Sequence, residues 1–385
     1  MTDKRGIFSL DEFYDLQVSG QTSNIFDVFK FPPIGGSFGY FTGGETPQSS
    51  AVDRVDFDND TATASPKGIL YVNRFAHGAV GNKFFGYVAG GNGGGQYTTV
   101  NRIEYVNDTA TATPKGNLSN QHTNTAGAGN DNYGYIGGSN PSTSSYINRI
   151  EFANDTETSV KKGNLTSARG LLAATGNQSF GYWGGGSPGS GYVSSVDRLD
   201  YSNDSVNTSP KGPLSSAKGY LTATGNASFG YFAGGETSLS TVDRIDYSSD
   251  TGTAPSKGPL NVGRHEMAAT GNTSFGYFAG GMYPSPSQRS TVDRIDYSND
   301  TATATTKGPL TRTARSFTGI SPREFANSTI VPQSSLGNRF IDNASQVSAS
   351  DLAPAFGYFH GGNPGYTKSR IDRLDYSNDT DVCVE

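Results

Sequence analysis

The sequence is poor in cysteine, in charge and in long apolar runs, and each shortage excludes a class of protein. Its single cysteine, Cys383, has no partner within the chain, so the fold does not depend on disulfide bonds. No stretch approaches the roughly 18 apolar residues of a membrane-spanning helix, so we expect no membrane insertion. The first residues, MTDKRGIFSLDEFYDLQVSG, carry acids through their apolar part and do not resemble a signal peptide.

Charged residues make up 17% of the chain, and the net charge is −6. Proteins that bind nucleic acid concentrate Lys and Arg on one surface or tail, so the sequence predicts no nucleic-acid partner. The chain also contains 51 glycines, 22 phenylalanines and 21 tyrosines. That composition is atypical of disordered chains and of helical bundles, and no helical periodicity is sustained.

A short motif recurs along the chain: an aromatic residue, glycine and tyrosine, running into a pair of glycines. Its tyrosines are separated by 47, 48, 47, 49, 46 and 81 residues. A period of this length is typical of propellers, solenoids and other repeat arrays. The seven copies are Phe38-Gly39-Tyr40, Phe85-Gly86-Tyr87, Tyr133-Gly134-Tyr135, Phe180-Gly181-Tyr182, Phe229-Gly230-Tyr231, Phe275-Gly276-Tyr277 and Phe356-Gly357-Tyr358.

Each repeat divides into four short strand-like pieces, as in residues 264–270, 274–281, 290–300 and 301–308. Turn residues separate the pieces, and apolar side chains alternate within them. The sequence therefore predicts an all-β protein, a seven-bladed β-propeller with four antiparallel strands per blade. We expect the first blade to take its inner strand from 28–34 and the last to end in an outer strand at 380–385.

An arginine followed two residues later by an acid marks every repeat, as in VDRIDY. Side chains at i and i+2 share one face of a strand, so we expect repeated ion pairs that fix each blade or link it to its neighbour. The pairs are Arg54 and Asp56, Arg102 and Glu104, Arg149 and Glu151, Arg198 and Asp200, Arg244 and Asp246, Arg294 and Asp296, and Arg373 and Asp375.

These elements resemble the kelch family of propeller repeats. A kelch unit has a strand ending in two glycines, a variable loop and a strand carrying a tyrosine, which correspond here to GYFAGG, the loop and VDRIDY. The resemblance covers residues 28–385, but the tryptophan usual in kelch strands is missing. Another type of propeller repeat, or a different glycine-rich β array, is the alternative.

The loops after the glycine pairs vary most between repeats. They are rich in Ser, Gly, Pro, Asn and Tyr, a mixture that resembles an antibody paratope. We expect them to emerge on one face and to bind a glycan or a polar protein surface; the alternative is that they are merely solvated. The candidate binding residues are Tyr97, Tyr146, Tyr192, Tyr283 and Tyr366.

No catalytic, cofactor or metal motif stands out. The four histidines, at positions 77, 122, 265 and 360, fall in different repeats without the spacing of metal ligands. No nucleophile, histidine and acid form a recognisable set, so we expect no enzyme, no cofactor and no metal. The recurring Asn-Asp-Thr or Asn-Asp-Ser is formally a glycosylation sequon, but its fixed place after a strand favours a turn.

Two segments break the repeat. Residues 321–354 lengthen one unit, and residues 5–20 carry their own apolar pattern: Ile7, Phe8, Leu10, Phe13, Tyr14 and Leu16. A long loop inside a compact unit is usually functional. We therefore divide the chain into a docking segment at 1–24 and a propeller at 25–385 with an insertion at 321–354, and expect both segments to contact other proteins.

The long unit STVDRIDYSNDTATA…KGPL…TGNxSFGYFAGG, with GIFSLDEFYDLQ before it, resembles repeats of structural proteins from tailed bacteriophages, notably marine cyanophages. That resemblance implies a virion protein of the tail or its fibres, assembled in the host cytoplasm in several copies per particle. The expected function is non-enzymatic attachment to a host-surface glycan or receptor. One alternative is a decoration or neck protein whose loops contact other virion proteins, and another is a propeller enzyme acting on polysaccharide.

Overall fold

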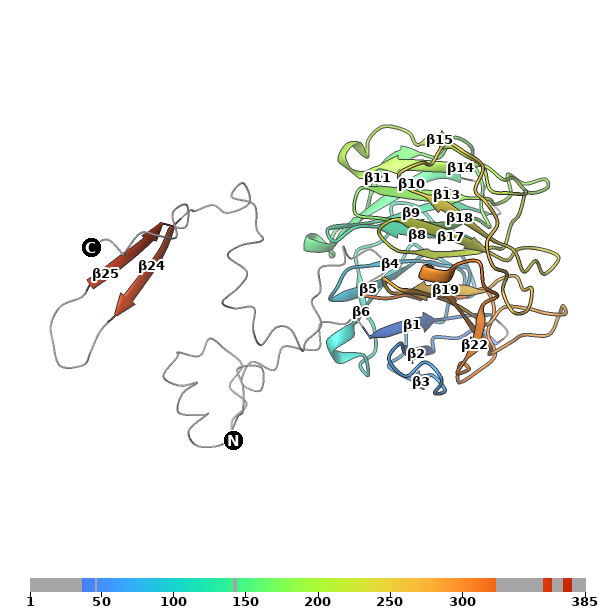
Figure 1. Cartoon of the computed structure of the whole chain (residues 1–385), viewed down its shortest axis with the longest axis horizontal. Coiled ribbons are helices and arrows are strands. Elements are labelled where there is room, and N and C mark those ends of the chain that lie inside the picture. The colour runs from blue at the N-terminus through green and yellow to red at the C-terminus, as the bar shows by residue number, and fades with distance from the viewer. Residues whose placement is uncertain (1–36, 46, 141–143, 323–355, 362–369, 376–385) are drawn as a thin grey trace. The chain divides into compact units, whose positions relative to one another are not determined.

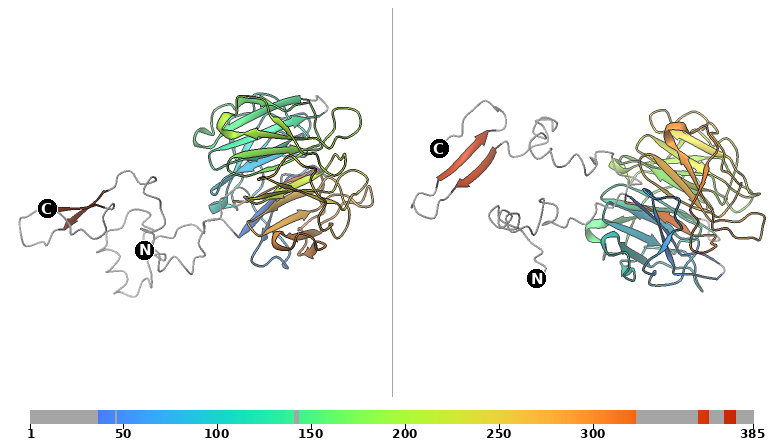
Figure 2. Two further views of the ribbon diagram at one scale, coloured as in Figure 1. Left: turned by 45° about the horizontal axis from the view of Figure 1, so that its top comes forward. Right: turned by 60° about the horizontal axis from the view of Figure 1, so that its bottom comes forward.

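A computed structural model describes residues 37–45, 47–140, 144–322, 356–361 and 370–375. The chain divides into two compact units, one up to Ser328 and one from Thr329 to Glu385. The first unit contains six β-sheets arranged around a common centre (Figures 1 and 2). Each innermost strand contacts the innermost strand of the next sheet, so the sheets are the blades of a β-propeller.

The first three blades run as follows. Blade 1 contains β23 (Thr318–Ile320), β1 (Phe38–Thr42), β2 (Val52–Asp56) and β3 (Ser65–Pro66). Blade 2 contains β4 (Gly78–Gly81), β5 (Phe85–Ala89), β6 (Val100–Glu104) and β7 (Thr113–Lys115). Blade 3 contains β8 (Ala126–Gly129), β9 (Tyr133–Ser139), β10 (Ser144–Glu151) and β11 (Val160–Asn164).

The last three blades continue the pattern. Blade 4 contains β12 (Ala173–Gly176), β13 (Phe180–Gly184), β14 (Val196–Asp200) and β15 (Ser209–Lys211). Blade 5 contains β16 (Thr222–Gly225), β17 (Phe229–Ala233) and β18 (Val242–Asp246), with a single bridge between Asp243 and Ser256 at the place of its outer strand. Blade 6 contains β19 (Ala268–Gly271), β20 (Phe275–Ala279), β21 (Val292–Asp296) and β22 (Thr305–Lys307).

Short 3₁₀ turns follow the third strand of four blades. They are η1 (Tyr105–Asn107), η2 (Phe152–Asn154), η3 (Tyr201–Asn203) and η4 (Tyr297–Asn299). These turns contain the recurring Asn of the Asn-Asp-Thr motif, so the structure places a turn where the sequence predicted one. The aspartate that follows each of these turns binds side chains of the neighbouring blade.

The prediction of seven blades is wrong: the propeller has six. The ring closes when β23 pairs antiparallel with β1, with Tyr40 opposite Ile320, so the segment directly after the sixth repeat supplies the inner strand of blade 1. The repeat count could not show this, because a period reveals how many units exist but not how many join one ring. The inner strand expected at 28–34 lies outside the described residues.

The seventh repeat belongs to the second unit. Its strands β24 (Phe356–Gly361) and β25 (Arg370–Asp375) form a two-stranded antiparallel sheet. Tyr358 lies opposite Arg373, the same register as Tyr40 opposite Arg54 in blade 1. The segments expected at 1–24 and 321–354 lie outside the described residues, except for Ser321 and Pro322.

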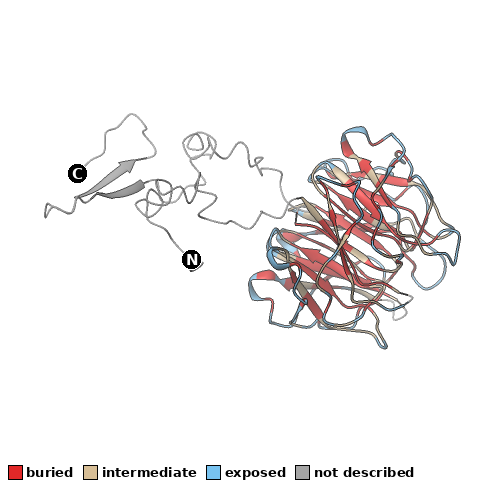
Figure 3. Cartoon of the chain, turned by 90° about the horizontal axis from the view of Figure 1, so that it is seen from below, coloured by how far each residue is buried: buried red, intermediate tan, exposed pale blue. Residues whose placement is uncertain are grey.

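The core consists of six apolar clusters, each shared by two neighbouring blades. Buried residues lie mainly in the inner three strands of each blade, and exposed residues lie mainly in the loops (Figure 3). At most junctions an aromatic ring from one blade stacks on a ring from the next, as Tyr135 stacks on Tyr201 at 4.7 Å between ring centroids. Such pairs add about 0.5–1.5 kcal/mol beyond burial of their area.

A buried carboxylate joins each blade to the next. Asp204 accepts hydrogen bonds from Tyr135 Oη at 2.9 Å and Arg149 Nη1 at 2.8 Å, and Lys162 Nζ lies 3.0 Å from its other oxygen. Burial raises the pKa of Asp204, but the hydrogen bonds of Lys162, Tyr135 and Arg149 outweigh it and hold the pKa below its ordinary value.

The same arrangement occurs at all six junctions. The other sets are Tyr40, Arg54 and Lys67 on Asp108; Tyr87, Arg102 and Lys115 on Asp155; Tyr182, Arg198 and Lys211 on Asp250; Tyr231, Arg244 and Lys257 on Asp300; and Tyr277, Arg294 and Lys307 on Asp60. The last set joins blade 6 to blade 1. The network is therefore cyclic, and it closes after six blades.

The repeated arginines therefore bind mainly to the next blade rather than to the acid two residues away. Within the six blades, only Arg102 also contacts the acid of its own strand, Glu104, at 2.6 Å. The i and i+2 side chains do share a face, but a buried aspartate from the neighbour satisfies the guanidinium better than an exposed one. The side chains of Arg373 and Asp375 lie outside the description.

Replacing Arg149 with alanine should lower the free energy of unfolding by about 1–3 kcal/mol, because Asp204 loses a charged hydrogen-bond partner. The matched control is Glu151→Ala, because Glu151 is exposed and contacts neither Arg149 nor Asp204. We expect that control to change stability by less than about 0.5 kcal/mol. Urea unfolding measures both, and equal losses would contradict the assignment of the arginine to the next blade.

A chain that ends at Ser328 should unfold at nearly the same temperature as the full chain, because the ring is already closed by β23. A chain that ends at Ser316 lacks β23 and leaves the edge of β1 unpaired. It should lose cooperative unfolding or melt well below the longer chain. Differential scanning calorimetry compares the two, and equal stability of both truncated chains would refute closure by β23.

Acid should destabilise the ring at its junctions. The pKa values of Asp155, Asp204 and Asp250 are all lowered in the folded protein. These three carboxylates therefore stabilise the fold fully above the pKa of an unfolded aspartate, which is about 4. That stabilisation is lost as the pH falls through their lower pKa values in the folded protein. Melting temperatures should be level from neutral pH to about 5 and fall steeply below about 4; a level profile through that range would contradict the pKa shifts.

Candidate functional site

The variable loops and the turns that lead into the inner strands lie at the same end of the ring. In blade 2, Gly78 at the start of β4 pairs with Ala89 at the end of β5, directly before Gly90-Gly91. The same register recurs in blades 4, 5 and 6. We call this end of the ring the loop face; it comprises the glycine-pair loops and the turns before the inner strands.

Six residues with left-handed backbone form a closed ring at the centre of the loop face. Each has a φ between 50° and 59°, and each donates its backbone N–H to the carbonyl of its counterpart in a neighbouring blade. The residues are Ala76, Asn124, Leu171, Tyr220, Glu266 and Ser316. None is glycine, although that φ is unfavourable for other residues, and strained residues of this kind gather at functional sites.

Beneath this left-handed ring, the next residue of each turn points into the propeller. These six residues are buried and line one end of a central cavity of about 90 Å³. They are His77, Thr125, Leu172, Leu221, Met267 and Phe317. Ligand pockets usually have volumes of about 300–1,000 Å³, so the cavity has room for a few waters but not for a sugar.

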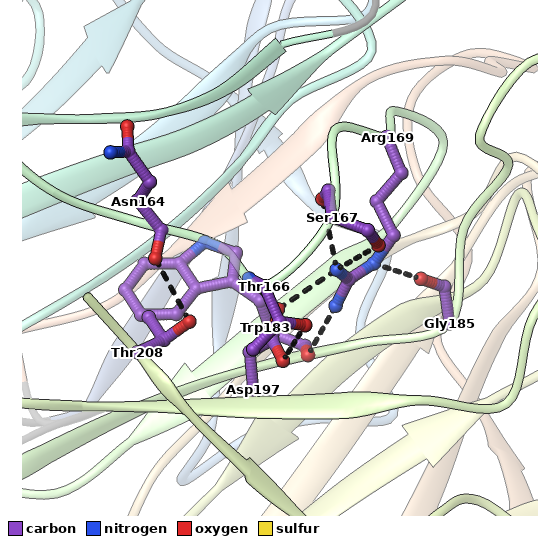
Figure 4. A network of polar contacts seen from close by, with 8 residues as sticks. All are labelled: Asn164, Thr166, Ser167, Arg169, Trp183, Gly185, Asp197 and Thr208. Atoms are coloured by element: carbon purple, nitrogen blue, oxygen red, sulfur yellow. Dashed lines mark hydrogen bonds and ion pairs between the residues drawn. The ribbon is translucent and has the colours of Figure 1, made fainter.

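Buried cations hold the loop face in place. Arg169, two residues before Leu171 of the left-handed ring, is fully buried and donates to Gly185 O at 2.9 Å, Trp183 O at 3.2 Å and Asp197 Oδ2 at 2.9 Å (Figure 4). It thereby ties the turn before β12 to the glycine pair after β13. Both loops of blade 4 are fixed by one side chain.

The other blades vary this arrangement with matched charges. Lys218 pairs with Asp243 and Arg264 with Asp293, each at 2.8 Å. In blade 3 the cation is replaced by His122, and its partner is the neutral Asn148 at 2.6 Å. Burial lowers the pKa of His122, so the neutral pair suits that position. These contacts hold the backbone of the loop face in place. The blades therefore differ mainly in the exposed side chains that this backbone carries.

Those differences produce one cluster that combines aromatic and acidic side chains. Tyr220 of the left-handed ring lies edge-on to Tyr192 from the loop of blade 4, with centroids 6.5 Å apart. His265 lies edge-on to Tyr220 from the other side at 6.4 Å, and its Nδ1 is 3.3 Å from Ser238 Oγ. Tyr192 is exposed and Tyr220 half-buried, so the two rings offer a partly open aromatic corner.

Carboxylates surround this corner. Glu266 follows Tyr220 around the left-handed ring, and Arg315 lies between it and Glu45, at 3.1 Å and 3.2 Å respectively. Ser316 Oγ donates to Glu266 and, at 3.3 Å, to Glu45. We call Tyr192, Tyr220, Glu45, Glu236, Glu266, His265 and Arg315 the tyrosine–glutamate cluster.

Burial and these carboxylates raise the pKa of both tyrosine hydroxyls. Burial raises the pKa of Tyr192, and the negative charge of Glu236 raises it further. Burial also raises the pKa of Tyr220, to which Glu266 and Glu236 add. Both hydroxyls are therefore neutral at physiological pH, and that of Tyr192 is hydrogen-bonded to Glu236. A site with donors, carboxylate acceptors and aromatic faces can bind a polar, uncharged ligand.

The predicted tyrosines do not form one site. Tyr192 belongs to the tyrosine–glutamate cluster, whereas Tyr97 is half-buried and donates to Gly93 O at 2.8 Å within its own loop. Tyr146 is exposed on β10 with Lys161 Nζ 3.7 Å from its ring, and Tyr283 is exposed in the loop of blade 6. Tyr366 lies outside the described residues. No pair among the four described tyrosines forms a ring contact.

Sequence reasoning missed Tyr220, Glu266 and Arg315. They sit in the turns between repeats, which look like featureless connections in the sequence. One signal was available: in four blades the left-handed residue lies two positions after a buried cation, as Tyr220 follows Lys218, whereas His122 and Ala314 take that position in blades 3 and 1. At such a position the backbone conformation is the same in every blade but the side chain differs. A repeat protein can therefore vary its surface there.

Comparison with known proteins identifies the fold only. No family model and no curated protein matches the sequence. A solved structure titled "Structure of YjhT" superposes with a TM-score of 0.56 at 12% identity, over 71% of this chain and 97% of that one. The chain is thus similar in fold to another β-propeller. This similarity in fold indicates no activity, and it does not connect the chain with kelch repeats or bacteriophages.

Two further searches concern the described part of the chain. There, no helix is long and apolar enough to cross a membrane. Among the same residues, no group of three or more His, Cys, Asp or Glu side chains is placed to hold a metal ion. The tyrosine–glutamate cluster is included in that statement, because Arg315 lies between Glu45 and Glu266.

Proposed function

We propose that this protein is a non-enzymatic binding module that attaches to a glycan through the tyrosine–glutamate cluster. The observation that supports the proposal is the aromatic corner of Tyr192 and Tyr220 set among carboxylates on a rigid backbone. Sugars present apolar faces that pack on aromatic rings and hydroxyl groups that pair with carboxylates and phenols. The exposed ring of Tyr192 supplies the first kind of contact, and Glu236 and Glu266 supply the second.

Rigidity favours recognition of this kind. The left-handed ring fixes the backbone of Tyr220 and Glu266 by hydrogen bonds on both sides, and buried Lys218 and Arg264 fix the loops beside them. A prearranged site loses little conformational freedom on binding, which improves affinity. The backbone of the loop face is thus preorganised while its exposed side chains carry specificity.

The biological setting of the proposal comes from sequence resemblance alone. We infer that the module is a kelch-like virion component of a tailed bacteriophage, in its tail or tail fibres, where several copies would attach to a glycan or receptor on the host surface. Its segments outside the ring would contact other virion proteins. A decoration or neck protein is the alternative within this setting, with the loop face as an assembly contact.

An enzyme acting on polysaccharide is a second candidate, and one observation favours it. The variable loops contain few acidic residues in the sequence. The fold nevertheless places Glu45, Glu236, Glu266 and His265 on one face. Glycoside hydrolysis uses two carboxyl groups, one of them an acid with a raised pKa. Here Glu45 and Glu266 both pair with Arg315, at 3.2 Å and 3.1 Å, an arrangement that favours binding over hydrolysis.

The double variant Tyr192→Ser/Tyr220→Ser should lose most binding to a glycan array and to host-cell envelopes. Truncating an aromatic residue at the centre of a binding site typically costs about 2 kcal/mol or more, so the affinity should fall by about tenfold or more. The matched control is Tyr283→Ser, an exposed tyrosine of the same face outside the cluster, which should bind normally. Release of sugar from the bound glycan would favour the enzyme instead.

Equal loss of binding in the control would show that the cluster is not the site. No binding by the unchanged protein would contradict the proposal and favour a decoration protein. Calorimetric melting of all three proteins separates loss of binding from loss of fold.

A further inference from the structure

One blade departs from the repeat by exposing apolar side chains. Phe84 precedes β5 and is 51% exposed, whereas the corresponding residues of the other blades are Ser37, Asn132, Ser179, Ser228 and Ser274. Val106 in η1 is 65% exposed, and its counterparts are Asp58, Ala153, Ser202, Ser248 and Ser298. Two positions that are polar or small elsewhere are thus large and apolar in blade 2.

These two residues are neighbours. The carbonyl of Phe84 accepts the backbone N–H of Tyr105 at 3.2 Å, and Val106 follows directly. Exposed Lys83 lies beside them, with its Nζ 5.0 Å from the ring of Phe84. We call Phe84, Val106 and Lys83 the blade 2 patch; it lies at the opposite end of the ring from the loop face, because β5 runs from Phe85 towards Gly90-Gly91.

The chain enters the ring next to this patch. β1 begins at Phe38 at the same end as Phe84, and Phe38 packs with Tyr105 in one cluster together with Ile320. Tyr105 is the residue between the two halves of the patch: its N–H bonds to Phe84, and Val106 follows it. The chain that precedes β1 therefore starts within contact distance of an apolar surface that no other blade has.

That preceding chain has a matching pattern. Residues 7–16, IFSLDEFYDL, hold six large apolar residues and three acids, Asp11, Glu12 and Asp15. The apolar residues suit Phe84 and Val106, and the acids suit Lys83. The 20 residues between Leu16 and Ser37 span up to about 3.3–3.6 Å each, which is ample length to return to the patch.

We propose that residues 7–16 dock on the blade 2 patch of their own chain, in place of the partner chain considered from the sequence. Phe84 and Val106 then serve as an intramolecular receptor for the N-terminal segment. The polar counterparts in the other blades explain why the segment selects blade 2. The inference does not depend on the glycan-binding function, because the patch and the loop face lie at opposite ends of the ring.

Hydrogen exchange in the full chain tests the proposal. Replacing Phe8 and Phe13 with serine should speed exchange at the amides of Phe84 and Tyr105 by about tenfold and leave the equivalent turn of blade 4, at Tyr201 to Asp204, unchanged. The effect should persist on dilution. Unchanged exchange in the variant would overturn the proposal, and protection that disappears on dilution would assign the patch to a second copy of the chain.

The complementary variant changes the patch itself. Phe84→Ser/Val106→Ser should fold normally, because serine occupies both positions in blades 4, 5 and 6. Trypsin should then cleave after Lys4 and Arg5 faster than in the unchanged protein. Val206→Ser, which removes an equally exposed apolar side chain from blade 4, is the control and should cleave at the original rate. Equal cleavage in all three proteins would overturn the proposal.

Discussion

The buried aspartate at each blade junction is the contact on which the rest of the propeller depends. A carboxylate removed from water is unfavourable unless it is paired and hydrogen-bonded. Here a tyrosine, an arginine and a lysine from the preceding blade meet that requirement together, as at Asp204. Each blade contains all four groups, but its donors bind the aspartate of the next blade, so its charges are paired only when its neighbours are in place. Apolar packing between the sheets supplies stability, and the carboxylates set the register between neighbours.

The same contact joins the last blade of the ring to the first. The donors of blade 6, Tyr277, Arg294 and Lys307, need an aspartate from another blade, and Asp60 of blade 1 supplies it. Once that contact and the pairing of β23 with β1 are made, every junction of the ring is satisfied. The seventh repeat has no place within the closed cycle, and its two strands belong to the second unit.

Much of the propeller could be predicted from the sequence, because its determinants are local. Alternation, glycine pairs and the Asn-Asp turns identify strands and their order, and Tyr40, Arg54 and Lys67 are visible as repeated residues. The blade number and the partner of each arginine could not be predicted. The partner of Arg149 lies 55 positions away, and the contact of Arg294 with Asp60 that closes the ring joins residues 234 positions apart, whereas sequence spacing favoured the nearer acid two residues away. Tyr192 was recognised as a site residue because its loop varies, whereas Tyr220 and Glu266 lay in turns with no local signal.

Repetition and function are separated within every turn at the loop face. The left-handed backbone is the same in all six blades, whereas the side chain that each left-handed residue carries differs from blade to blade. The scaffold can therefore accept alanine at position 76 and tyrosine at position 220 without altering the hydrogen bonds that hold either. Six such positions around one centre let a repeat protein with six-fold backbone symmetry present an asymmetric surface. The tyrosine–glutamate cluster occupies one side of that surface, where blades 4, 5, 6 and 1 contribute Tyr192, Tyr220, Glu266 and Arg315.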